Sequence, residues 1–111
     1  MQIQHKQYAR VDLVEVSGRI DSTNAGQLEE TFKGITEDKR FRIVVDMEKL
    51  EYMSSRGLRA LIGTLKECRR WNRGDLRLCN VPPRIHEVLD LAGLTPLFKA
   101  FDNAVDAVGS F

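Results

Sequence analysis

Hydrophobic and polar residues alternate along several short stretches of the chain, and this period is typical of β-strands. Alternating valines predict a strand at about 11–17, ended by Gly18 and preceded by an edge strand near 2–6. The β-branched run at 42–46 predicts a buried strand, and alternating leucines predict a further strand at 75–80. The strands are therefore spread along the chain rather than grouped at one end.

Between these strands, apolar residues recur at spacings of three and four, which predicts amphipathic helices. Asn24 followed by Gln27 has the form of a capping pair, and it predicts a first helix that ends near Gly34. The clearest apolar stripe belongs to a second helix and consists of Leu58, Leu61, Ile62, Leu65 and Cys68. Both helices are expected to bury one face against a sheet.

The last third of the chain continues the same alternation. The prolines at 82–83 predict the start of a third helix, which Gly93 ends. A short strand is expected at 97–101, and Asp102 or Asn103 is expected to cap a last helix. Strands alternating with helices, without a long linker, predict an α/β fold. The period alone does not fix the order of the strands.

The chain contains 111 residues, a length that fits one domain able to bury about two-thirds of its unfolded surface. We therefore expect a single domain at 1–111. The charges nearly balance, with 17 basic and 16 acidic residues. Nucleic acid is not expected as a partner, because its binding relies on an excess of basic groups. No apolar run is long enough to cross a membrane, so the sequence predicts a cytoplasmic protein without a membrane partner.

Two adjacent serines, Ser54 and Ser55, lie where the strand at 42–46 and its following loop give way to the second helix. The first N–H groups of a helix lack partners within the helix and carry partial positive charge. A serine hydroxyl can cap them, and a phosphate group is accommodated there. Capping is the common role of serine at this position, so position alone does not indicate regulation.

The residues around the two serines resemble the signature of STAS domains, the anti-sigma factor antagonists of bacteria. The chain reads Tyr-Met-Ser-Ser-Arg-Gly-Leu at 52–58, and the family has an aromatic-hydrophobic-Asp-Ser-Ser-Gly-Leu type of loop at the start of its second helix. The segment 11–21 is similar to the family's first conserved strand and its Gly-x-Leu/Ile-Asp turn, and 89–98 is similar to the end of its third helix. The resemblance covers nearly the whole chain.

The resemblance implies a small STAS-like domain with a mixed β-sheet and helices packed mainly on one side. It also implies an anti-sigma factor antagonist that binds its partner when unphosphorylated. That partner would be an anti-sigma factor and serine kinase of the histidine-kinase-like ATPase type, and a PP2C-type phosphatase would reverse the phosphorylation. A constitutive STAS scaffold, or a ligand-binding subunit of a transport or signalling complex without serine phosphorylation, is the alternative.

Aligned on Gly57, Ser55 takes the place of the family's phosphorylated serine, and Ser54 is the alternative acceptor. The chain departs from the family at Ser54, where Asp is usual, and at Arg56, where a small residue is usual. By analogy, Asp21 and residues 54–57 would form the centre of the partner surface. Capping of its own loop is an equal explanation for Asp21, and Gly57 indicates either a tight loop or close approach of a partner backbone.

Basic residues form a second stripe on the helix that follows Ser55. Helical spacing aligns Arg56, Arg59, Lys66 and Arg70. Such a stripe is usually a solvated face, although its adjacency to Ser55 also allows Arg59 and Arg56 to contact a partner.

Motifs of catalysis or cofactor binding do not occur in the sequence. It has no Gly-x-Ser-x-Gly elbow, P-loop, dinucleotide fingerprint or His-Glu-x-x-His motif, so neither an enzyme nor a cofactor or metal site is expected. Cys68 and Cys79 have no partner at a metal-ligand spacing and are expected to be reduced thiols in the core. His86 is expected on the surface of a helix or in its cap region rather than as a general base.

Overall fold

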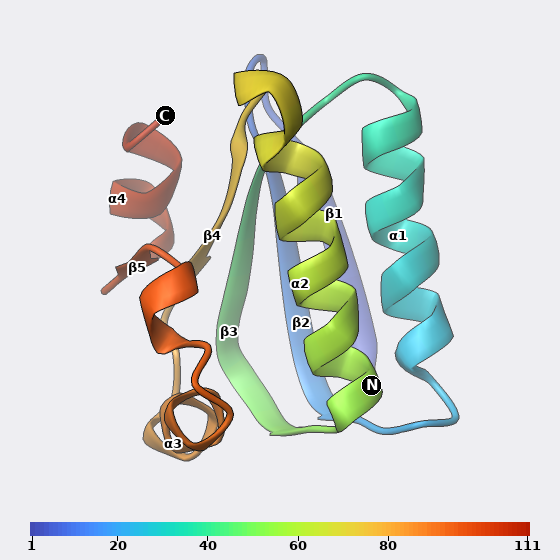
Figure 1. The fold of residues 1–111 in the computed structure, drawn as a ribbon, viewed down its shortest axis with the longest axis vertical. Coiled ribbons are helices and arrows are strands. Elements are labelled where there is room, and N and C mark those ends of the chain that lie inside the picture. The colour runs from blue at the N-terminus through green and yellow to red at the C-terminus, as the bar shows by residue number, and fades with distance from the viewer.

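The computed structural model describes residues 1–111, which form one five-stranded sheet with helices on both faces (Figure 1). The strands are β1 (Gln2–Gln7), β2 (Asp12–Ile20), β3 (Arg42–Met53), β4 (Asp75–Cys79) and β5 (Ala100–Phe101). The helices are α1 (Ala25–Glu37), α2 (Ser55–Arg69), α3 (Pro83–Leu91) and α4 (Ala104–Gly109). Two short 3-10 segments, η1 (Arg70–Asn72) and η2 (Thr95–Leu97), follow α2 and α3.

The sheet is mixed, as the family resemblance implies. Its strands lie in sequence order, with β1 antiparallel to β2 and the other neighbours parallel. Helices α1, α2 and α3 cover one face and form the main core with it, whereas α4 covers part of the other face through Ala107, which packs with Val44 and Cys79. The expectation that helices pack mainly on one side is therefore confirmed. None of the helices combines the length and apolarity that a membrane span requires.

The sequence pattern placed some boundaries wrongly. Gly18 does not end its strand, because its positive φ of 82° is taken up at an irregularity in the pairing with β3, and the strand continues to the buried Ile20. Gly34 does not end α1, which continues to Glu37 and buries Ile35 on the way. The strand expected at 97–101 is limited to its last two residues because η2 occupies its start.

Two capping predictions had different outcomes. The Asn24 side chain does not cap α1; its Oδ1 accepts a hydrogen bond from the Asp21 N–H, and its Nδ2 donates to the Arg19 carbonyl. Asn103 does cap α4, because its Oδ1 accepts a hydrogen bond from the Asp106 N–H at 2.8 Å.

Both cysteines are buried and free, as predicted. Burial raises the pKa of Cys68 and of Cys79 to about 12, so both thiols stay protonated at neutral pH. His86 lies on the outside of α3, 3.4 Å from Asp90 one turn later.

Candidate functional site

The two serines have different roles at the junction between β3 and α2. Ser54 is the N-cap of α2, and its hydroxyl accepts a hydrogen bond from the Gly57 N–H at 3.3 Å. The Ser54 N–H donates to the Ile20 carbonyl at 2.8 Å, which fixes the loop to the end of β2. Ser54 is half-buried, and its side chain is committed to holding the helix start.

Ser55 is the first residue of α2 and is exposed to solvent. Its hydroxyl makes no hydrogen bond within the chain, in contrast to that of Ser54. The free hydroxyl lies beside the unpaired N–H groups of the first helical turn, where a negatively charged group is stabilised by the helix dipole. The geometry therefore distinguishes the two serines: the Ser54 hydroxyl is hydrogen-bonded at the helix start, whereas the Ser55 hydroxyl is exposed and has no partner within the chain.

Asp21 begins the neighbouring loop, which lies beside the start of α2 because Ile20 pairs with Met53 at the ends of β2 and β3 (Figure 1). Its Oδ1 accepts three hydrogen bonds: from the Thr23 N–H at 2.9 Å, from the Thr23 hydroxyl at 2.6 Å and from the Asn24 N–H at 3.1 Å. These bonds, those to Thr23 first, lower the pKa of Asp21. Asp21 thus orders its own loop through one carboxylate oxygen, while Oδ2 has no partner within the chain.

Arg56 reaches across to α1, although its side chain remains 42% exposed. Its Nε donates to Glu29 Oε1 at 2.9 Å, and a second guanidinium nitrogen donates to the Ser22 carbonyl at 3.0 Å. The side chain therefore connects the start of α2 to the loop that Asp21 orders. Glu29 and Ser22 could not be recognised from the sequence as partners of Arg56, because 27 and 34 residues separate them from it and no motif includes them.

Arg59 is exposed and forms no ion pair, although it lies one turn from Arg56. Both arginines line an open groove of about 560 Å³ between α1 and α2. The other two members of the predicted basic stripe, Lys66 and Arg70, line a different groove farther along α2. The stripe is therefore divided between two surfaces.

Gly57 is buried, and contacts within the chain explain why glycine is needed at this position. A Cβ atom at this position would lie 2.9 Å from Met53 Cγ and 3.0 Å from Ile20 Cγ2. The helix start consequently packs tightly on the ends of β2 and β3. Of the two explanations offered for this glycine, tight local geometry accounts for it without a partner.

We expect Gly57→Ala to destabilise the protein. Overpacking costs about 1–3 kcal/mol, which exceeds the gain of about 1 kcal/mol that alanine brings to a helix. Gly63→Ala is the matched control on the same helix, because nothing lies within 4 Å of its added Cβ and the substitution should therefore be stabilising. Urea unfolding of both variants measures the difference. Stabilisation by both substitutions would show that the contact at Gly57 is not tight.

Comparison with known proteins identifies a family and similar relatives. Residues 2–107 match the family described as the STAS domain. The putative anti-sigma factor antagonist BtrV of Bordetella bronchiseptica is 31% identical over 96 residues, which cover 86% of this chain and 82% of that protein.

Solved structures share the fold. An anti-sigma factor antagonist from Mycobacterium paratuberculosis has a TM-score of 0.86 at 24% identity, covering 98% of this chain and 92% of that one. The Bacillus cell fate determinant SpoIIAA in its phosphorylated form has a TM-score of 0.77 at 19% identity. The match covers 98% of this chain and 98% of that one.

Proposed function

Since the chain belongs to the STAS-domain family of anti-sigma factor antagonists, we propose that phosphorylation of Ser55 controls its binding to an anti-sigma factor. Such antagonists are regulators rather than enzymes, in agreement with the absence of catalytic motifs from the sequence. The observation that carries the proposal is the contrast between the hydrogen-bonded hydroxyl of Ser54 and the free, exposed hydroxyl of Ser55.

The proposed partner is an anti-sigma factor that is also a serine kinase of the histidine-kinase-like ATPase type. It would bind the unmodified chain at the surface formed by Ser55, Arg56 and the Asp21 loop, and then phosphorylate Ser55. A PP2C-type phosphatase would remove the phosphate and restore binding. The solved phosphorylated form of SpoIIAA supports the proposal to the extent that a protein of this fold exists in a phosphorylated state.

The physical effect of the phosphate would be local. It adds about −1.5 to −2 charges at pH 7, which an exposed helix N-terminus accommodates without refolding. A fitted, desolvated interface does not accommodate the same charge unless it supplies a partner for it. Phosphorylation would thus release the anti-sigma factor while leaving the fold of the antagonist unchanged.

Calorimetric titration of the chain with its cognate anti-sigma factor tests this function. We expect binding in the absence of ATP and loss of binding after incubation with ATP, because the kinase would have modified Ser55. A PP2C-type phosphatase should restore the first result. Equal affinity before and after ATP would contradict the switch and favour the constitutive scaffold.

Arg56→Ala and Arg59→Ala should each slow association with the anti-sigma factor several-fold and weaken its dependence on salt. Charges at the rim of an interface act mainly on the association rate. Arg59 has no partner within the chain, so Arg59→Ala changes only the electrostatic attraction between the two proteins. Arg56→Ala also leaves the Glu29 carboxylate unpaired, so this variant should associate more slowly than Arg59→Ala. Stopped-flow binding at low and high ionic strength measures both. Unchanged association rates would show that these arginines belong to a solvated face and do not contact the partner.

A further inference from the structure

The end of α2 far from Ser55 carries an exposed tryptophan. Trp71, the single tryptophan of the chain, is 75% exposed and therefore contributes little to the core. Its φ of 58° lies in the left-handed region, which is unfavourable for a bulky residue, and Asn72 shares this conformation. An exposed aromatic residue held in an unfavourable conformation is more typical of a binding surface than of a structural element.

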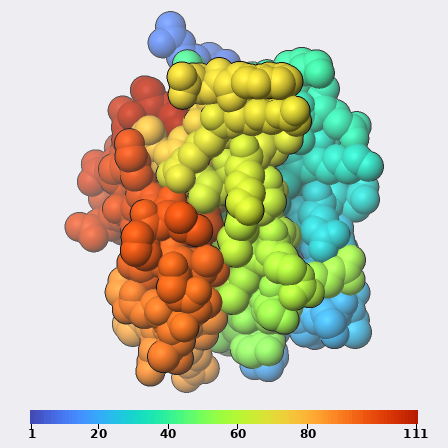
Figure 2. Space-filling model, viewed as in Figure 1, coloured from blue at the N-terminus to red at the C-terminus, as the bar shows by residue number.

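A groove with an apolar floor lies between α2 and η2, and one of its lining residues, Arg70, stacks on this tryptophan. It has a volume of about 340 Å³, and Ile62, Leu65 and Leu97 line it together with cationic side chains. Arg70 is shared between the two features, because it lines the groove and its guanidinium lies 4.3 Å from the centroid of the Trp71 ring. In Figure 2 the yellow segment that follows α2 forms the top of this face, with the orange segment that contains η2 below and beside it.

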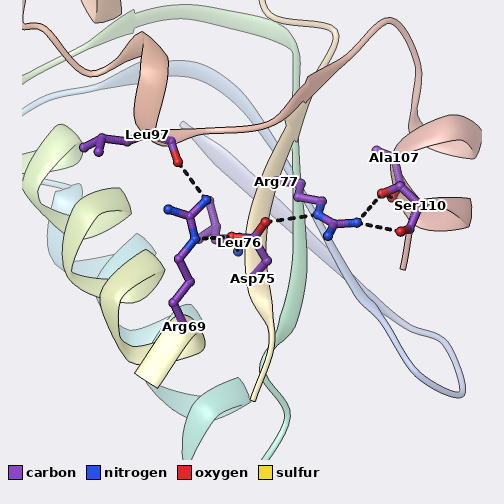
Figure 3. Close-up of polar contacts among 7 residues, drawn as sticks. All are labelled: Arg69, Asp75, Leu76, Arg77, Leu97, Ala107 and Ser110. Atoms are coloured by element: carbon purple, nitrogen blue, oxygen red, sulfur yellow. Dashed lines mark hydrogen bonds and ion pairs between the residues drawn. The ribbon is translucent and has the colours of Figure 1, made fainter. Parts of the chain in front are cut away.

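The walls of the groove are held together by hydrogen bonds. Arg69 at the end of α2 donates to Asp75 Oδ1 at 2.7 Å and to the Leu97 carbonyl at 2.8 Å, so that it connects α2, β4 and η2 (Figure 3). Arg77 donates to the other oxygen of Asp75 at 3.1 Å. The groove is consequently a fixed part of the fold rather than a gap between loose segments.

The charge around the groove is positive and uncompensated. No carboxylate lines the groove, and Asp75, next to it, is already paired with Arg69 and Arg77. Glu67 lines the other groove of α2 and lies 2.9 Å from Arg73. Lys66 and Arg70 form no ion pair and are exposed. Two free cations beside an apolar floor complement a ligand that combines carboxylates with apolar side chains.

The small extent of the positive surface beside the groove indicates which class of ligand it binds. Nucleic acids and anionic bilayers are bound through broad basic surfaces, whereas this chain has a net charge of only +1. A short peptide needs no such extended field. An apolar groove, two cations and a tryptophan stacked on one of those cations match the anchor and rim of a peptide-binding surface.

We propose that the groove between α2 and η2, together with Trp71 stacked on its Arg70, binds a short acidic segment of a partner protein that carries apolar side chains. This surface is separate from the proposed phosphorylation site, because 15 residues of helix correspond to about 22 Å. The chain would then contact partners at both ends of α2, and phosphorylation of Ser55 would control one end only. The second surface goes beyond the Ser55 switch and does not depend on it.

The fluorescence of Trp71 tests the proposal directly, because no other tryptophan contributes to the emission. The probe is a synthetic eight-residue peptide of alternating Glu and Leu, and the control is its Lys and Leu counterpart. We expect a saturable blue shift with the acidic peptide and none with the basic one. Arg70→Gln and Lys66→Gln should each weaken binding several-fold, and together at least tenfold.

Two further variants separate this surface from the rest of α2. Arg59→Gln removes an exposed, unpaired cation of the same helix outside the groove and should leave peptide binding unchanged. Ser55→Asp should also leave it unchanged, whatever its effect on the anti-sigma factor. Thermal unfolding of each variant shows that the fold is retained.

The proposal fails if the acidic peptide causes no saturable shift, or if Arg59→Gln weakens binding as much as Arg70→Gln. It also fails if phosphatidylserine vesicles or a single-stranded oligonucleotide shift the emission at lower concentration than the peptide does. These last results would assign the surface to a membrane or to nucleic acid instead.

Discussion

Ser55→Asp is expected to weaken binding to the cognate anti-sigma factor by roughly 100-fold, or about 3 kcal/mol. Ser55 is exposed at the start of α2, beside the Asp21 loop and the Arg56 side chain, so a partner that covers this end of the sheet would also cover its hydroxyl. A carboxylate placed in such an interface without a partner loses its hydration and gains no ion pair in return.

Ser55→Ala and Ser54→Ala are the matched controls. Ser55→Ala should bind like the unmodified chain and become insensitive to ATP. Ser54→Ala removes the cap of α2, so it should lower the free energy of unfolding by about 1 kcal/mol while keeping its sensitivity to ATP. Equal affinities of Ser55→Asp and Ser55→Ala, measured by calorimetry, would show that Ser55 is not at the interface.

Arg40→Leu is expected to cause the largest loss of stability, about 3 kcal/mol in the free energy of unfolding. The Arg40 Nε donates to Asp12 Oδ1 at 2.5 Å, and its terminal nitrogens donate to the carbonyls of Tyr8 and Ala9 in the turn between β1 and β2. Asp12 is 1% exposed, so the substitution leaves a buried carboxylate with only His5, at 2.6 Å, as a partner.

Urea unfolding compares this variant with two others. Arg42→Leu is the matched control, because Arg42 is exposed and forms no ion pair, and its loss should change stability by no more than about 0.5 kcal/mol. The double variant Arg40→Leu with Asp12→Leu should recover much of the loss, since it removes the buried charge along with its partner. Equal stabilities of the Arg40 and Arg42 variants would contradict the structural role given to this ion pair.

Sequence periodicity predicted the strands and helices well where side-chain burial alternates regularly. The apolar stripe of α2 and the alternating leucines of β4 are examples, because in each case one face packs in the core. The predictions failed at Gly18 and Gly34, where glycine was taken as an end signal. A glycine at a strand irregularity, or on an open helix face, does not interrupt hydrogen bonding in the element.

The strand order and the position of α4 could not follow from periodicity, because both depend on contacts between distant segments. Ala107 of α4 packs against Val44 of β3 on the face opposite α1 and α2, and no local pattern distinguishes the two faces. The family resemblance supplied the mixed sheet that the period could not.

The sequence located both serines at the helix start but could not separate their roles. The separation depends on one hydrogen bond, from the Gly57 N–H to the Ser54 hydroxyl, which requires three-dimensional geometry. The division of the basic stripe between two surfaces could not be predicted from the sequence either. It arises because Arg56 pairs with Glu29, while Lys66 and Arg70 line a groove together with Leu97. Helical spacing aligns side chains along a helix, but neighbouring elements determine what each one contacts.

Tandem mass spectrometry of the tryptic peptide that ends at Arg56 is the most direct test of the proposed switch. After incubation with the cognate kinase and ATP, the phosphate should be found on Ser55, in the unsubstituted chain and in Ser54→Ala alike. An unmodified peptide, or a phosphate confined to Ser54, would contradict the assignment of Ser55 as the acceptor.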